Sequence, residues 1–194
     1  MLNIHTLTLG LFQTNCYIVH NNGSDRCVVI DPGYDAKKIL NFLNEKDLQL
    51  EAILLTHGHF DHVGGVKDLV ADTDCRVFLH PAEHTMPHNI TAGKLYATDD
   101  YAPRFSVAGM DVTVLHTPGH TPGSVCLIIE GAMFSGDTLF AGSCGRTDLP
   151  GGDWATIQIS LHRLKDLPMD YRVLPGHAEA TTLSQEKQTN PYLR

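Results

Sequence analysis

The 194-residue sequence lacks several features that would assign it to a common class of protein. None of its five cysteines belongs to a C-x-x-C pair, and their odd number argues against a disulfide framework. No Lys/Arg-rich run interrupts a formal net charge of −8, which excludes the basic footprint of a nucleic-acid-binding protein. No apolar run is long enough to span a bilayer, and the N-terminal "MLNIHTLTLG" has no basic segment before a continuous apolar stretch. We therefore expect a cytoplasmic protein with free thiols, and neither a membrane nor a nucleic acid as its partner.

The sequence also lacks a linker, a low-complexity tract and a clear internal repeat, so residues 1–194 are predicted to form one domain. Short apolar runs predict buried strands at 27–31, 52–56, 112–115, 125–129 and 172–174. Helical spacing of apolar residues predicts helices that begin after Asp35, near Val63 and after Asp153. Strands that alternate with helices favour an α/β domain in which helices cover the sheet faces.

Histidine, in contrast, is abundant, with 12 residues in the chain. Four potential metal ligands lie in "HGHFDH" (57–62), directly after the predicted strand at 52–56. Three further candidates follow other predicted strands, in "TPGH", "MFSGD" and "RVLPGH". The seven candidates are His57, His59, Asp61, His62, His120, Asp137 and His177. Because ligands of open α/β sheets bind beyond the carboxyl ends of the strands, we expect these side chains to converge.

The residue types indicate a metal centre. Zinc, iron and manganese accept imidazole and carboxylate ligands, and a cysteine-rich structural zinc site is disfavoured. In "HGHFDH" the first two histidines lie on one side of an extended turn and the Asp-His pair points elsewhere, so one loop serves two places. His120 and His177 are candidates to complete them, and Asp137 could bridge through its two oxygens. Two metals roughly 3.5–4 Å apart can clamp a hydrolytic transition state. Two carboxylates and a hydroxide would leave about one positive charge, which favours an anionic substrate.

The motifs "THGHFDH", "TPGHTPGS", "SGDTLF" and "LPGH", in this order and spacing, resemble the metallo-β-lactamase superfamily, and most of all its glyoxalase II-like (hydroxyacylglutathione hydrolase-like) branch. The stretches "GRTDLPGGD" (145–153) and "EKQTNPYL" (186–193) are also typical of its short members. The resemblance implies a four-layer αβ/βα sandwich with the metal site at the edge between two sheets. It implies one metal on His57, His59 and His120, a second on Asp61, His62 and His177, and Asp137 shared between them.

The same resemblance implies a reaction. A hydroxide that bridges two divalent ions, zinc in preference to iron or manganese, would attack the carbonyl of a small, anionic acyl thioester of the acylglutathione type. Asp61 is the candidate catalytic residue, interpreted as a ligand first and as a proton acceptor second. Glyoxalase II enzymes carry a C-terminal helical domain that contacts glutathione; only residues 178–194 follow His177, so we expect that domain to be absent. Asp137 stands where zinc-cysteine lactamases have cysteine, which disfavours that subclass.

Three other functions stay open. The "GRTD" stretch is shared with single-iron persulfide dioxygenases, in which the resemblance implies iron on His57, His120 and Asp137 alone. A lactone or phosphodiester hydrolase of the same superfamily is the second, although long RNA is disfavoured without a basic face. A metal-binding domain without turnover is the third.

Several residues beside the motifs have two interpretations. Arg146 is the candidate for binding a substrate carboxylate, because its fork matches carboxylate geometry, and an ion pair with Asp148 is the alternative. Cys144 could be a reactive thiol, but an incidental cysteine is favoured. His80, His84 and His88 have helical spacing and are predicted to form a solvated helix face. No feature of the sequence indicates an oligomeric state.

Overall fold

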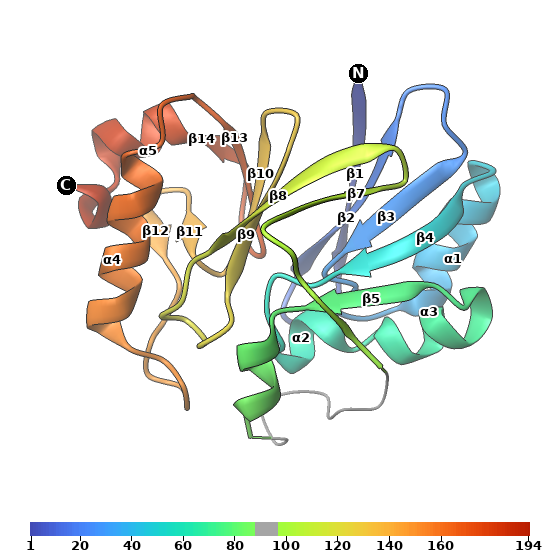
Figure 1. The fold of residues 1–194 in the computed structure, drawn as a ribbon, viewed down its shortest axis with the longest axis horizontal. Helices are drawn as coiled ribbons and strands as arrows, with labels where there is room; N and C mark the ends of the chain where they lie inside the picture. Colours follow the sequence, from blue (N-terminus) through green and yellow to red (C-terminus); the bar gives the residue numbers. More distant parts are fainter. Residues whose placement is uncertain (88–96) are drawn as a thin grey trace.

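The computed structural model describes residues 1–87 and 97–194, and its first half is built on a six-stranded sheet (Figure 1). The strands lie in chain order: β1 (Leu2–Leu9), β2 (Thr14–Asn21), β3 (Arg26–Ile30), β4 (Gln49–Leu54), β5 (Arg76–Leu79) and β6 (Asp99–Asp100). β1, β2 and β3 pair antiparallel, and β3 to β6 pair parallel. The carboxyl ends of the parallel strands therefore meet at one edge of this sheet.

A second six-stranded sheet is built from the C-terminal half of the chain. Its spatial order is β14 (Thr181–Thr182), β13 (Arg172–Pro175), β10 (Ala132–Gly136), β9 (Val125–Ile129), β8 (Met110–His116) and β7 (Arg104–Val107). Its pairs are antiparallel except β10 with β13. A two-stranded ribbon, β11 (Leu139–Phe140) and β12 (Ser143–Cys144), follows β10.

Helices cover the outer faces of both sheets, as Figure 1 shows. The helices of the first half are α1 (Ala36–Glu45), α2 (Phe60–Val63) and α3 (Val66–Thr73), and those of the second are α4 (Trp154–Lys165) and α5 (Leu183–Thr189). Short 3-10 helices span η1 (Pro81–Thr85) and η2 (Pro191–Leu193).

The apolar side chains pack in three clusters that correspond to this layering. In β3, Cys27 and Val29 pack toward α1 and α3, whereas Val28 and Ile30 pack toward the second sheet. This alternation follows from the two-residue repeat of a strand. A third cluster joins the second sheet to α4 through residues such as Leu161. The predicted four-layer αβ/βα sandwich is thus confirmed, with candidate metal-binding side chains between the two sheets.

The helix predicted near Val63 is two helices, because the chain bends at Gly64 and Gly65. The N–H of Gly65 donates to the carbonyl oxygen of Pro32, 2.8 Å away. A Cβ atom on Gly64 would lie 2.2 Å from the carbonyl oxygen of Gly33. Only glycine allows this close approach of the loop after β3, so α2 ends there and α3 begins at Val66.

Two predicted helix caps have different outcomes. Asp153 caps α4 as predicted, since its carboxylate accepts from the N–H of Thr156 at 2.7 Å. Asp35 does precede α1, but its φ of 52° lies in the left-handed region and its side chain makes no capping hydrogen bond.

The solvated helix face predicted for the histidines at 80, 84 and 88 is wrong for the two that are described. The segment forms only the five-residue η1, and the His80 ring stacks on that of His116, with centroids 4.1 Å apart. His84 contacts the hydroxyl of Thr98 at 3.1 Å. His88 lies outside the described residues.

Candidate metal centre

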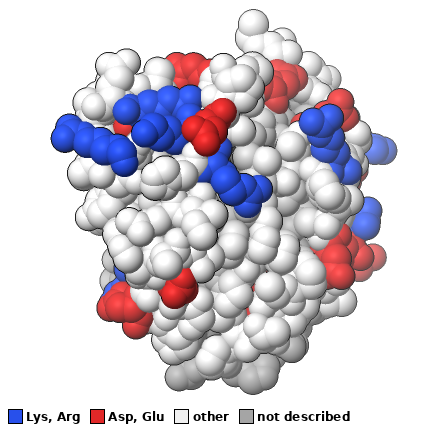
Figure 2. All heavy atoms as spheres, turned by 60° about the vertical axis from the view of Figure 1, so that its left-hand side comes forward, with Lys and Arg blue, Asp and Glu red and all other residues white. Residues whose placement is uncertain are grey.

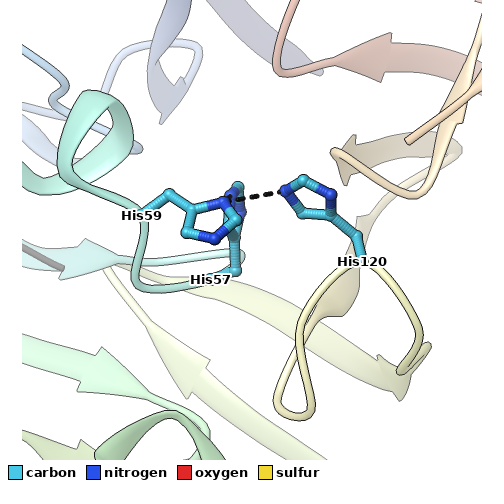
Figure 3. Close-up of side chains that lie close together, drawn as sticks. All are labelled: His57, His59 and His120. Atoms are coloured by element: carbon cyan, nitrogen blue, oxygen red, sulfur yellow. Dashed lines mark hydrogen bonds between the residues drawn. The ribbon is translucent and has the colours of Figure 1, made fainter. Parts of the chain in front are cut away.

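Three buried histidines from two loops form a first cluster. His57 and His59 follow β4, and His120 lies in the loop between β8 and β9. The Nδ1 atom of His59 lies 3.1 Å from Nε2 of His57 and 2.9 Å from Nε2 of His120. Figure 3 shows the three rings pointing toward one another. One nitrogen of each lies within 4.8 Å of the other two, a spacing that could hold a metal ion.

The second cluster combines Asp61 and His62, both in α2, with His177, which follows β13. The Nε2 atoms of His62 and His177 are 3.3 Å apart. The Asp61 carboxylate lies 3.3 Å from Nε2 of His177 and 3.8 Å from Nε2 of His62. The "HGHFDH" loop therefore contributes to two neighbouring clusters.

Asp137 lies between the clusters, directly after β10. Its Oδ1 is 3.4 Å from Nε2 of His62, and its Oδ2 is 3.5 Å from Nε2 of His120. Oδ2 is also 3.6 Å from Nε2 of His177. The structure thus brings all seven predicted residues together around one carboxylate that reaches both clusters.

Backbone carbonyl groups fix the tautomer of two of these histidines. Nδ1 of His120 lies 2.7 Å from the carbonyl oxygen of Arg146, and Nδ1 of His177 lies 3.1 Å from that of Phe12. Because a carbonyl oxygen can only accept, each Nδ1 carries the hydrogen and each Nε2 keeps a lone pair. Both lone pairs face the centre of the site.

Asp31, which was not among the residues predicted from the sequence, fixes the tautomer of His62 directly and that of His57 through Thr56. This carboxylate, 2 % exposed at the end of β3, accepts from Nδ1 of His62 at 3.0 Å and from the hydroxyl of Thr56 at 2.6 Å. It also accepts from the Thr56 N–H, and the Thr56 hydroxyl oxygen in turn accepts from Nδ1 of His57. Asp31 ends the predicted strand 27–31, so the strand-end rule that selected the other candidates could have found it.

The centre is built to receive cations. The Nε2 atoms of His62 and His177 lie 3.3 Å apart, closer than two nitrogen lone pairs approach without a proton or a metal ion between them. Oδ1 of Asp137, which lies 3.4 Å from Nε2 of His62, is buried without a hydrogen-bond partner among the described residues. Buried polar atoms are rarely left so, and a nitrogen and oxygen donor set suits zinc, iron or manganese. The residues therefore fit two adjacent divalent ions.

The pKa shifts of the buried histidines and of Asp137 agree with a centre that binds cations. Burial, together with the neighbouring His120, lowers the pKa of His59 to about 4, so its imidazole is unprotonated at neutral pH. Burial would raise the pKa of Asp137, but His62 and then His120 hold it well below its ordinary value. Burial would lower the pKa of His62, but Asp137 and Asp31 raise it well above its ordinary value. The carboxylates therefore stabilise positive charge at the centre.

A second carboxylate missed by the sequence analysis joins the two loops of the first cluster. Glu83, in η1, is 3 % exposed and accepts from the N–H of Gly58 and from the N–H of Gly123, each at 2.7 Å. Gly58 lies between His57 and His59, and Gly123 lies in the loop of His120. Nothing in the sequence distinguishes this glutamate, because its partners are backbone groups distant along the chain.

A pocket of about 650 Å³ opens over both clusters. Besides the candidate ligands, its walls include the apolar side chains Phe12, Phe60, Phe140 and Leu149. Cys144 also lines it, half-buried, and burial raises the pKa of its thiol. All five cysteines are free, as predicted.

Arg146 lines the same pocket and forms the ion pair that was the alternative to substrate binding. Its Nε and Nη2 donate to the two carboxylate oxygens of Asp148 at 2.6 and 2.7 Å. Both side chains are largely exposed. The guanidinium fork is therefore already matched to a carboxylate of the protein itself.

Charge is mixed on one face of the molecule. On the face in Figure 2, basic side chains gather in patches with acidic side chains among them, rather than in a stripe that could follow a nucleic-acid backbone. In the described parts of the chain, the helices are all too short or too polar to cross a bilayer.

The chain is similar to several known proteins along nearly its whole length. Residues 9–177 match the metallo-beta-lactamase superfamily. The hydroxyacylglutathione hydrolase GloC of Haemophilus influenzae is 34% identical over 210 residues, which cover 99% of this chain and 98% of that protein.

Two crystal structures share the fold. That of BLEG-1 B3 metallo-beta-lactamase superposes with a TM-score of 0.89 at 35% identity, covering 98% of this chain and 99% of the other. That of TTHA1623 in a di-iron-bound form gives 0.87 at 39% identity, covering 97% and 100%. Relatives this similar along nearly their whole length, the match over 9–177 and the shared sandwich together establish that the chain belongs to the metallo-β-lactamase superfamily.

Proposed function

We propose that this metal-dependent hydrolase cleaves acyl thioesters at a centre of two divalent ions. The proposed ligands are His57, His59 and His120 for one ion and Asp61, His62 and His177 for the other, with Asp137 between them. The observation that carries the proposal is the convergence of five histidines and two carboxylates, of which His59, Asp61, His120, Asp137 and His177 line one pocket. The relative named hydroxyacylglutathione hydrolase supports the thioester, and the di-iron-bound relative supports two ions.

The side chains of this chain have defined tasks in that reaction. When bound, two divalent ions lower the pKa of a water molecule toward 7 and polarise a carbonyl oxygen. Burial would raise the pKa of Asp61, but its hydrogen bond with His177 and the nearby His62 lower it, so the carboxylate is ionised at neutral pH. Asp61 lies at the pocket floor, where it can orient the attacking water and accept its proton. The leaving thiol has an ordinary pKa near 8.5 and departs as thiolate without a strong acid.

The test combines metal analysis of the purified protein with hydrolysis of lactoylglutathione and other thioesters. We expect about two ions per chain and turnover that stops on chelation and returns on reloading. His59→Ala and Asp137→Ala should each lose at least one ion and most of the activity. His162→Ala is the matched control, since this exposed histidine of α4 bonds only to the carbonyl oxygen of Gln158 and should keep both.

Other outcomes would replace the proposal. About one iron per chain with oxygen uptake would indicate a dioxygenase, and two tightly held ions without turnover of any thioester, lactone or phosphodiester would indicate a binding domain. Full activity of the metal-free protein would overturn the ligand assignment itself.

A further inference from the structure

The pocket walls are apolar where they face the substrate. Phe12 comes from the loop between β1 and β2, Phe140 from β11 and Leu149 from the loop before α4. The rings of Phe12 and Phe60 meet edge to face, with centroids 5.3 Å apart. Large apolar side chains from four separate segments therefore line the pocket, an arrangement that in ligand sites binds apolar groups.

These side chains also remain accessible. Phe12 is 55 % exposed and Phe60 is 38 % exposed. A substrate that covers exposed aromatic surface is bound more tightly, because removing apolar area from water is favourable by about 25 cal/mol per Å².

Positive charge, in contrast, is scarce in the pocket. Arg146 is the one lysine or arginine among the described residues that line it, and Asp148 already occupies two of its donors. At the floor, two divalent ions would bring four positive charges, which Asp61, Asp137 and the buried Asp31 reduce to one. A hydroxide ion would reduce this to about zero. The net charge of about +1 predicted from the sequence for a centre with two ions and a hydroxide therefore falls to about zero when the third carboxylate, Asp31, is included.

Glutathione offers the opposite chemistry. It carries two carboxylates and an ammonium group, and its recognition through those ends requires unpaired charged or polar partners. The pocket offers one guanidinium that is already paired, and its remaining walls are mainly apolar.

We propose that the enzyme selects thioesters by an apolar acyl group lying against Phe12, Phe60, Phe140 and Leu149, and does not require the charged ends of glutathione. This inference rests on the proposed thioester hydrolysis. It assigns the apolar wall as the specificity-determining surface of the same site.

The experiment compares four thioesters with the metal-loaded enzyme. Acetyl and phenylacetyl groups are each joined to glutathione and to uncharged N-acetylcysteamine, with lactoylglutathione alongside. The phenylacetyl group should raise kcat/KM at least tenfold over acetyl on either thiol, which corresponds to burial of roughly 55 Å² of apolar surface at about 25 cal/mol per Å². Replacing glutathione by N-acetylcysteamine should change kcat/KM by less than about threefold.

Variants test which side chains give the preference. Phe12→Ala should lower the phenylacetyl-to-acetyl ratio, and its backbone carbonyl, which holds His177, is retained. Leu149→Ala, in a different loop, should lower the same ratio. Leu11→Ala is the matched control, because this neighbour is 97 % exposed and does not line the pocket, so it should leave the ratio and the activity unchanged. Arg146→Ala should affect glutathione and N-acetylcysteamine thioesters equally.

The failures of the two proposals differ. Hydrolysis of lactoylglutathione with no gain from phenylacetyl, or with a ratio that Phe12→Ala and Leu149→Ala leave unchanged, would overturn the apolar selection and leave the proposed function standing. An Arg146→Ala variant that raises KM only for glutathione thioesters would also overturn it. Absence of turnover with all five thioesters would remove the proposed function itself.

Discussion

Glu83 holds together the two loops that supply the first histidine cluster, and its replacement by glutamine tests whether that link positions a metal. Each carboxylate oxygen accepts one backbone N–H at 2.7 Å, from Gly58 and from Gly123. Glutamine keeps the size of the side chain but presents an NH₂ donor in place of one oxygen. One buried N–H then loses its acceptor, which costs about 1–3 kcal/mol in the free energy of unfolding.

The same change should reach the metal. Gly58 separates His57 from His59, and the loop of Gly123 carries His120, so a loosened link lets the first two imidazoles move relative to the third. We expect Glu83→Gln to weaken one of the two metal-binding steps on the order of tenfold, the lower end of the cost of losing supporting contacts around a metal site. Competition with a chromogenic chelator resolves the two steps, and thermal unfolding of the metal-free protein gives the stability.

Glu186→Gln is the matched control. Glu186 is also a buried glutamate, 2 % exposed, but its Oε2 accepts from both Gly142 N–H and the Asn190 amide at 2.8 Å, and its Oε1 accepts from the Thr181 hydroxyl at 2.7 Å. A glutamine oxygen can keep the first two bonds and its NH₂ can donate to the hydroxyl, so this control should lose less stability than Glu83→Gln and leave both metal affinities unchanged. If Glu83→Gln loses stability but keeps wild-type metal affinities, as Glu186→Gln does, Glu83 supports the fold only and does not position the site.

Three further predictions concern the same region. Asp31→Asn places an NH₂ donor where Nδ1 of His62 or a Thr56 group needs an acceptor, so it should weaken metal binding about 10–100-fold, measured by competition with a chelator. An unchanged metal affinity would show that His62 needs no such partner. Because burial raises the pKa of Cys144, its alkylation, followed by peptide mass spectrometry, should be slow at pH 7 and still increase with pH above about 8.5, where an unshifted thiol levels off; a rate that levels off there would contradict the shift. Gly119→Ala places a Cβ 2.3 Å from the backbone nitrogen of Ile157 at a φ of 134°, so it should lower the unfolding temperature and the metal content together; retention of both would refute the close packing of this loop against α4.

The parts of the fold that the sequence predicts are those with a strong repeat. The runs at 27–31 and 125–129 are buried strands because both of their faces meet apolar layers, and their continuous apolar sequence shows it. β6, β11, β12 and β14 have two residues each, too few for any periodicity. The sequence does not predict the break between α2 and α3 at Gly64, because the helical spacing of apolar residues continues from Val63 to Val66. The bend is required only by the carbonyl oxygen of Gly33, which approaches Gly64 closely.

The candidate site likewise contains residues that the sequence predicts and residues that it does not. The seven candidate ligands were found because metal chemistry restricts the residue types and because strand ends restrict their positions. Asp31 and Glu83 are ordinary carboxylates in the sequence, and their roles depend on partners 25 to 40 residues away. Arg146 had two interpretations that only the position of Asp148 could separate.

Substrate choice must depend on a different part of the molecule from the metal centre. Relatives with the same fold and similar overall identity carry names as different as a lactamase and a hydroxyacylglutathione hydrolase, so the shared sandwich does not select the substrate. The candidate ligands lie just after strands, in α2, or, for His120, in a loop that Glu83 ties to that of His57 and His59. Phe12 and Leu149, in contrast, belong to loops that can change without disturbing either sheet. Metal content and acyl preference should therefore vary independently: Phe12→Ala should alter the preference at constant metal content, and His59→Ala should remove metal whichever thioester is offered. A Phe12→Ala protein that lost its metal would show that the apolar wall and the metal centre are one structural unit and do not vary independently.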